Sequence, residues 1–193
     1  MNIVQIISDP YVLPFAGADL RNEAIRANLI QYGNVVQVTP EMFLMPLPAD
    51  DLQDGLNSSP DLIVVEGVQL MGVAQKMHAL YPEARFIFDF HNVESDLLRQ
   101  QDIAKLPSVL RPFAPIVFHK RWRKARALDL FALEMAETVW VCSAEDKQRV
   151  SKLCKNPPRI AIVPNLAPNS IEKIKPQEPV QARNGPVLLF VGH

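Results

Sequence analysis

The chain has 193 residues, 48% of them hydrophobic and 21% charged, which is typical of an ordinary globular protein. This length allows one full α/β domain with a core and the start of a second domain. The formal net charge of −1 excludes a general attraction to nucleic acid or to an anionic membrane, so any such attraction must be local.

The cysteine count and the hydropathy further limit the class of protein and its cellular compartment. Cys142 and Cys154 are too few for a disulfide framework and lack metal-ligand spacing, so we expect Cys142 to be a buried free thiol. The opening residues "MNIVQIISDP" have no basic region of the kind that begins a signal peptide. No stretch approaches the ~20 apolar residues of a membrane span. We therefore expect a cytoplasmic protein, at most peripheral to the inner face of a membrane, with no nucleic-acid partner.

Short apolar runs alternate with helical periodicity along the chain. Strands are predicted at 3–7, 35–38, 61–66, 85–90, 138–142 and 159–163, and helices at 18–32, 69–80 and 144–153. A long helical region, 94–136, is broken by Pro107, Pro112 and Pro115. After a polar linker at 165–186, one more strand is predicted at 187–191. This alternation predicts an α/β fold with a Rossmann-like, doubly wound parallel sheet.

Such sheets bind ligands beyond the carboxyl ends of their strands, where His91 is expected. A histidine there can act as a general base or hydrogen-bond a hydroxyl group, because its ordinary pKa is about 6.5. Asn92 and Ser95 are predicted to cap the following helix, and Glu94 suits its positive end. Asp89 is a candidate partner for His91, but the alternation of neighbouring side chains along a strand argues against the pairing.

Four segments in chain order carry a family resemblance: "FDFHNVESDLLRQ", "ALEMAETVWVCSAEDKQRV", "RIAIVPN" and "PVLLFVGH". Together they resemble the N-terminal half of a family-four-type glycosyltransferase of the GT-B architecture, in which two Rossmann-like domains face each other across a cleft. The resemblance implies an acceptor-side domain at 1–164 and an interdomain linker at 165–186. Residues 187–193 would then be the first strand of a missing C-terminal donor domain.

The resemblance also implies the chemistry of the site. A nucleotide-sugar donor would be the substrate, with no cofactor and no obligatory metal, and the acceptor would be a glycan or a lipid-linked molecule. His91 would lie near the reaction centre. In the turn that approaches the donor phosphates, Ala16 and Gly17 stand where the family has two glycines. The residues that the resemblance assigns to donor or acceptor binding are Ala16, Gly17, Arg21, Asn92, Glu94, Ser95 and Ser143.

Ser143 and a basic segment around Trp122 each have a simpler, structural interpretation. Ser143 also reads as the N-cap of the helix at 144–153, with Asp146 three residues later as in a loose capping box. A locally basic segment contains Lys120, Arg121, Trp122, Arg123 and Lys124. This patch suits an anionic membrane or a lipid-phosphate acceptor, or else it is a solvated helix face with Trp122 in the core.

Competing functions remain open at this stage. The leading hypothesis is the N-terminal part of a glycosyltransferase, inactive without its C-terminal domain, which could be on another chain. The first alternative is a non-catalytic Rossmann-like binding module or a subunit of a split enzyme. A third interpretation is half of a GT-B sugar-nucleotide epimerase.

Overall fold

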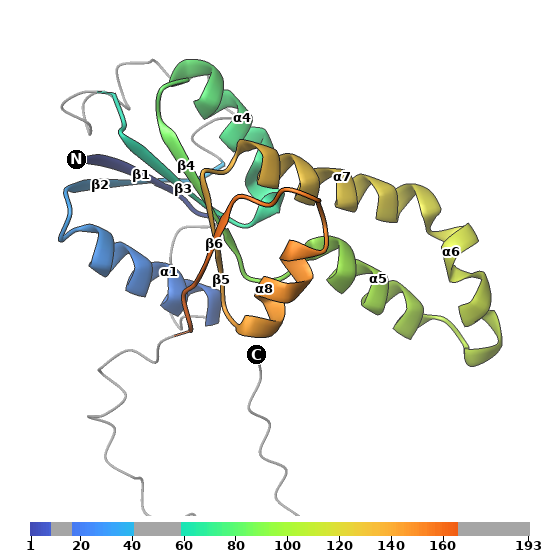
Figure 1. Cartoon of the computed structure of the whole chain (residues 1–193). Helices are drawn as coiled ribbons and strands as arrows, with labels where there is room; N and C mark the ends of the chain where they lie inside the picture. Colours follow the sequence, from blue (N-terminus) through green and yellow to red (C-terminus); the bar gives the residue numbers. More distant parts are fainter. Residues whose placement is uncertain (9–16, 41–58, 166–193) are drawn as a thin grey trace, which may run out of the picture.

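A six-stranded sheet, parallel throughout, forms the centre of the molecule (Figure 1). The computed structural model describes residues 1–8, 17–40 and 59–165. The strand order is β2-β1-β3-β4-β5-β6. The strands are β1 (Asn2–Ile6), β2 (Asn34–Val38), β3 (Leu62–Glu66), β4 (Arg85–Phe90), β5 (Thr138–Val141) and β6 (Arg159–Ile162). The predicted α/β fold with a Rossmann-like parallel sheet is confirmed.

Helices connect β1 to β2 and join the successive strands from β3 to β6, because parallel strands cannot be joined by tight turns. They are α1 (Gly17–Leu29), η1 (Val68–Leu70), α4 (Met71–Leu80), α5 (Glu94–Lys105), η2 (Ser108–Phe113), α6 (Ala114–Val117), α7 (His119–Met135) and α8 (Ala144–Ser151). Helix α1 lies on one side of the sheet, and α4 and α7 lie on the other (Figure 1). Within the described ranges, no helix is long and apolar enough to cross a membrane.

Strand β4 shows how the two faces of the sheet are divided. Phe86, Phe88 and Phe90 point toward α4 and α7 and are buried in the larger core. Ile87 points the opposite way and packs in the smaller core under α1. Because both faces of the central strands are covered, these strands are apolar along nearly their whole length, as in other parallel sheets.

The direction of winding reverses between β1 and β3, which are neighbours in the sheet. Sheets of this kind bind ligands at such a reversal, beyond the carboxyl ends of the strands. Gly67 directly follows β3 at this edge and has φ +77, a left-handed conformation that favours glycine. Its N–H donates to the carbonyl oxygens of Val65 and Asp89, so it links the ends of β3 and β4.

The predicted strands within the described residues all form, with ends shifted by at most one residue. The three prolines interrupt the long helical region as expected: α5 ends before Pro107, Pro112 lies inside η2, and Pro115 lies in the first turn of α6. The predicted strand at 187–191, the linker from residue 166 onward and Ala16 lie outside the described residues.

Candidate functional site at the carboxyl edge of the sheet

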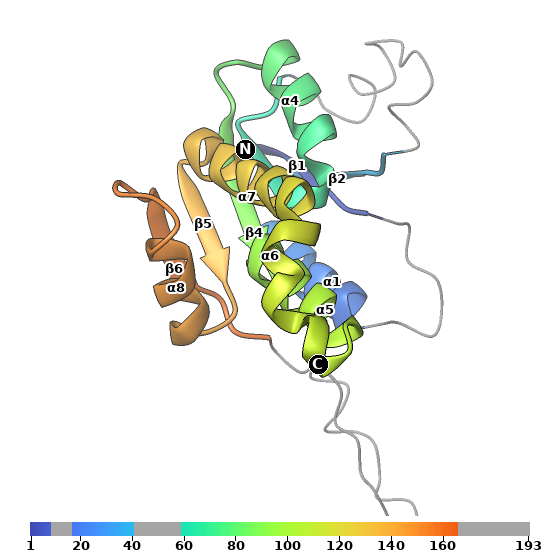
Figure 2. The same ribbon diagram turned by 90° about the vertical axis from the view of Figure 1, so that its right-hand side faces the viewer.

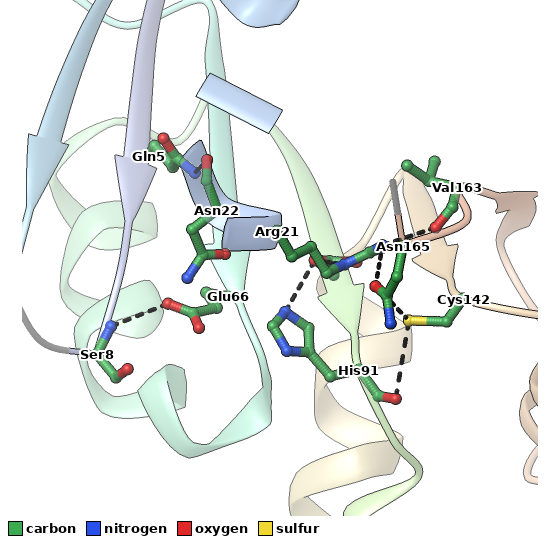
Figure 3. Close-up of polar contacts among 10 residues, drawn as sticks. Gln5, Ser8, Arg21, Asn22, Glu66, His91, Cys142, Val163 and Asn165 are labelled. Carbon is green, nitrogen blue, oxygen red and sulfur yellow. Dashed lines mark hydrogen bonds and ion pairs between the residues drawn. The ribbon is translucent and has the colours of Figure 1, made fainter. Parts of the chain in front are cut away.

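Arg21 of α1 and Asp89 of β4 form a two-point ion pair at this edge (Figure 3). Nε of Arg21 donates to Oδ2 of Asp89 at 2.8 Å, and Nη2 donates to Oδ1 at 2.6 Å. Both side chains are almost fully buried. Burial alone would raise the pKa of Asp89, but hydrogen bonding from Arg21 and the nearness of His91 outweigh it and lower the pKa.

The third nitrogen of Arg21 reaches the chain that follows β6. Nη1 donates to the carbonyl oxygen of Val163 at 2.7 Å and to Oδ1 of Asn165 at 2.9 Å. One guanidinium therefore joins α1, β4 and the exit of β6. All of its nitrogens are engaged by protein atoms here. The donor or acceptor contact that the resemblance implies for Arg21 therefore stays a prediction and would require an exchange of partners.

His91 lies beside this ion pair, with Nε2 2.9 Å from Oδ2 of Asp89. The expectation that strand alternation separates Asp89 from His91 is wrong, because the two residues are two positions apart and so point to the same face. The two atoms are close, but their alignment is not that of a good hydrogen bond. The His91 side chain is 22% exposed, so the ring is held on one side and accessible on the other.

A second buried carboxylate, Glu66, ends β3 on the same face. Its Oε2 accepts the backbone N–H of Ser8 at 3.1 Å, and Asn22 of α1 also interacts with it. Burial raises the pKa of Glu66, and these hydrogen bonds offset the effect only in part. A carboxyl group with a raised pKa can exchange a proton closer to neutral pH than an ordinary glutamate. Arg21, Asn22, Glu66, Asp89 and His91 are called the edge cluster below.

Cys142 borders the edge cluster and is half-buried, so the prediction of a buried thiol is wrong. It directly follows β5, where the sheet ends and the core no longer covers the chain. Its Sγ lies 3.9 Å from the carbonyl oxygen of His91 and 3.6 Å from Oδ1 of Asn165. Burial raises the pKa of the Cys142 thiol, which disfavours the reactive thiolate.

The first turn of α5 is stabilised by a residue that lies far away in the sequence. The N-cap residue is Val93, which makes no side-chain cap, so the predicted capping by Asn92 and Ser95 is wrong. Instead Oδ2 of buried Asp129, on α7, accepts the backbone N–H of Ser95 at 3.0 Å. Glu94 occupies the first turn of α5 as predicted, and Asn92 is exposed. A carboxylate near the free N–H groups of a helix is favourable wherever in the sequence it comes from.

Ser143 caps α8, as predicted. Its hydroxyl oxygen accepts the backbone N–H of Asp146 at 3.1 Å, and the hydroxyl donates to Oδ2 of Asp146 at 2.6 Å. This arrangement accounts for both residues structurally. A role for Ser143 in donor or acceptor binding stays a prediction.

A pocket of about 210 Å³ opens between α1 and the β5–β6 side of the sheet. Arg21 lies at its border, but His91 does not line it. The remaining lining includes Ile25, Leu29 and Trp140, so the pocket suits an apolar group better than a phosphate.

The basic patch lies elsewhere, on the pair of helices α5 and α7. Trp122 is half-buried between them: its Nε1 donates to Oδ2 of Asp102 at 3.0 Å, and Arg99 lies 5.4 Å from the ring centre. It is therefore neither a protruding anchor nor a residue of the main core. Lys120, Arg121, Arg123 and Lys124 are exposed on the outside of α7.

The structure brings together Arg21 and His91, which the sequence identified, through Asp89, which was considered as a partner for His91 and then set aside. Glu66 and Asn22 were missed. Strand alternation could have found the carboxylates, because Glu66 and Asp89 occupy the polar, α1-facing position at the end of otherwise apolar strands. In the described part of the chain, no group of three or more His, Cys, Asp or Glu side chains is placed to hold a metal ion.

No protein-family model matches this sequence, and no curated protein matches it. The glycosyltransferase resemblance therefore rests on the motifs alone.

Proposed function

We propose that this chain is the acceptor-side part of a glycosyltransferase, which moves a sugar from a nucleotide-sugar donor to a glycan or a lipid-linked acceptor. The observation that carries the proposal is the position of His91. Its ring is partly exposed at the carboxyl edge of a parallel sheet, next to the reversal of winding, where ligands bind in this fold class.

The charge of Asp89 gives His91 a defined role in this proposal. An ionised carboxylate facing Nε2 favours the tautomer that carries its proton on Nε2. Nδ1 is then an acceptor, able to hydrogen-bond or deprotonate a sugar hydroxyl group. Arg21 acts as a positioning residue, because it fixes the carboxylate that fixes the ring.

The proposal also includes a second domain that brings most of the donor contacts. Closure of two domains over the edge cluster would exclude water and complete the site. We expect the 193-residue chain by itself to give no turnover.

The proposal is tested in two stages. The coding sequence after His193 is read first, and the proposal expects it to encode a second Rossmann-like domain. The continuous protein is then assayed for transfer of labelled sugar from a panel of nucleotide sugars to membrane and glycan acceptors. Transfer by the unaltered protein is expected, and its absence across the panel would count against the proposal.

His91→Ala should lower the rate by about 10²–10⁴-fold, the usual contribution of a general base. The matched control is His78→Ala, which removes an exposed histidine from α4 on the other side of the sheet. Near-normal transfer by His91→Ala would remove this residue from the mechanism. Binding of a nucleotide sugar without any transfer would favour a binding module instead.

A further inference from the structure

Five large apolar side chains protrude together at the far end of the α5–α7 pair. They belong to η2 and α6, which join the two long helices at the end away from the sheet (Figures 1 and 2). Ile116 is 78% exposed and Val109 is 76% exposed. The apolar tip consists of Val109, Leu110, Phe113, Ile116 and Val117. Exposed apolar side chains scattered singly are normal, but such a group within nine consecutive residues marks an interaction surface.

The helical hairpin formed by α5, η2, α6 and α7 carries mostly positive charge. Residues 99–128 contain eight of the 20 Lys and Arg residues of the chain but only one of its 21 Asp and Glu residues. That one acid, Asp102, is buried and already engaged by Arg121 at 3.2 Å and by Trp122. The hairpin is therefore strongly basic, although the net charge of the whole chain is close to zero.

Three of these cations are close to the apolar tip and have no acidic partner among the described residues: Lys120, Arg123 and Lys124. At spacings of three and four residues they form one stripe along the first turns of α7. Helix α6 ends at Val117, one turn before Lys120, so the apolar tip and this basic stripe adjoin.

We propose that the apolar tip and the basic stripe dock the protein on an anionic lipid bilayer. The apolar side chains would enter the boundary between head groups and acyl chains, and the cations would contact the lipid phosphates. A nucleic acid would use the cations but leave the aliphatic side chains of the apolar tip in water, so a bilayer fits both observations better. The proposal does not depend on sugar transfer.

The test is co-sedimentation of the full 193-residue chain with phosphatidylcholine vesicles, with and without phosphatidylglycerol. Binding is expected only to the anionic vesicles and should weaken as salt is added. Arg123→Glu/Lys124→Glu should lower the partition coefficient roughly 30-fold, because each cation at an anionic surface contributes a factor of about five. Ile116→Ser/Val117→Ser should lower it by about tenfold or more.

Matched controls make the same chemical changes elsewhere on the surface. Lys147→Glu/Lys152→Glu reverses two exposed charges near α8, and Ile30→Ser/Leu80→Ser removes two exposed apolar side chains. Both controls should bind vesicles like the unaltered chain, and the circular dichroism of every variant should match it.

Three results would overturn the proposal. The first is equal binding to vesicles with and without phosphatidylglycerol. The second is unchanged binding by both hairpin variants. The third is self-association in sedimentation velocity that Ile116→Ser/Val117→Ser abolishes, with no vesicle binding, because this would assign the apolar tip to a second copy of the chain.

Discussion

Arg21 and Asp89 are 68 residues apart in the sequence, yet they meet as a buried pair joined by two hydrogen bonds of 2.6 and 2.8 Å. The pair connects the first helix to the fourth strand, and Nη1 of Arg21 extends the connection to the exit of β6. Because His91 lies against the same carboxylate, one residue takes part both in joining the elements of the fold and in the geometry of the candidate site.

Loss of one partner should be strongly destabilising. Arg21→Ala leaves the Asp89 carboxylate buried without its main partner, which should lower the free energy of unfolding by about 3–5 kcal/mol in urea denaturation. The matched control is Arg26→Ala, which removes an exposed arginine paired with Glu23 on the same helix. It should change stability by no more than about 0.5 kcal/mol. Similar small losses from both variants would show that the buried pair contributes little.

Replacing both partners distinguishes the attraction within the ion pair from the cost of burying its two charges. Arg21→Met/Asp89→Leu removes both buried charges together, and an apolar pair of similar size is often tolerated. This double variant should therefore be more stable than Arg21→Ala. The single variants Arg21→Met and Asp89→Leu complete the comparison. If their two losses in unfolding free energy add up to the loss in the double variant, the two residues are not coupled.

Asp129 should make stability depend on pH. Burial raises its pKa above the ordinary value of 3.8, and hydrogen bonding from Ser95, whose backbone N–H donates to Oδ2, lowers it less. The folded state therefore holds this proton more tightly than the unfolded chain. The resulting stabilisation is complete below pH 3.8 and is lost as the pH rises through the raised pKa.

Asp129→Asn lacks this titration but keeps an oxygen that can accept the Ser95 N–H. Its free energy of unfolding should therefore rise relative to that of the unaltered chain as the pH increases. Urea denaturation across this pH range measures the difference, with Glu83→Gln as an exposed carboxylate control. A difference that stays constant with pH would contradict the raised pKa.

The two glycines Gly67 and Gly72 should respond to alanine in opposite directions. Gly67 has φ +77, and a Cβ there would overlap the side-chain amide of Gln69, so Gly67→Ala should lower stability by about 1–2 kcal/mol. Gly72 lies in α4 with open space around it, and Gly72→Ala should raise stability by about 0.5–1 kcal/mol. Thermal unfolding measures both.

A further variant distinguishes backbone strain from crowding at Gly67. Gly67→Ala/Gln69→Ala removes the amide that the new Cβ would meet but leaves the left-handed backbone in place. It should remain less stable than Gln69→Ala. Full recovery would mean that crowding alone was responsible.

The cap of α8 gives a smaller, local effect. Ser143→Ala removes the acceptor of the Asp146 N–H and should lower the unfolding free energy by about 0.5–2 kcal/mol. Ser143→Thr keeps a hydroxyl that accepts this N–H and donates to the Asp146 carboxylate, so it should lose only a few tenths of a kcal/mol. The control Ser151→Ala removes an exposed hydroxyl that bonds its own helix, and we expect little change. Equal effects of Ser143→Ala and Ser151→Ala would contradict the capping role.

The sequence by itself determined the elements and the class of the sheet. Apolar runs, periodicity and prolines act over a few residues, so all six described strands and the breaks at Pro107, Pro112 and Pro115 could be predicted to within about a residue. The same local patterns placed His91 at the carboxyl edge and Ser143 at the start of α8, because each follows directly from where a strand ends.

Only the tertiary structure decided which distant groups meet. Asp129 of α7 caps α5, and Arg21 of α1 reaches Asp89 of β4 on the face of the sheet that α1 covers. Trp122 lies between two helices instead of entering the core. These contacts depend on the order of strands and the packing of helices on the sheet. A buried polar group needs a partner, but the sequence does not say which of the candidates packing will bring within 3 Å.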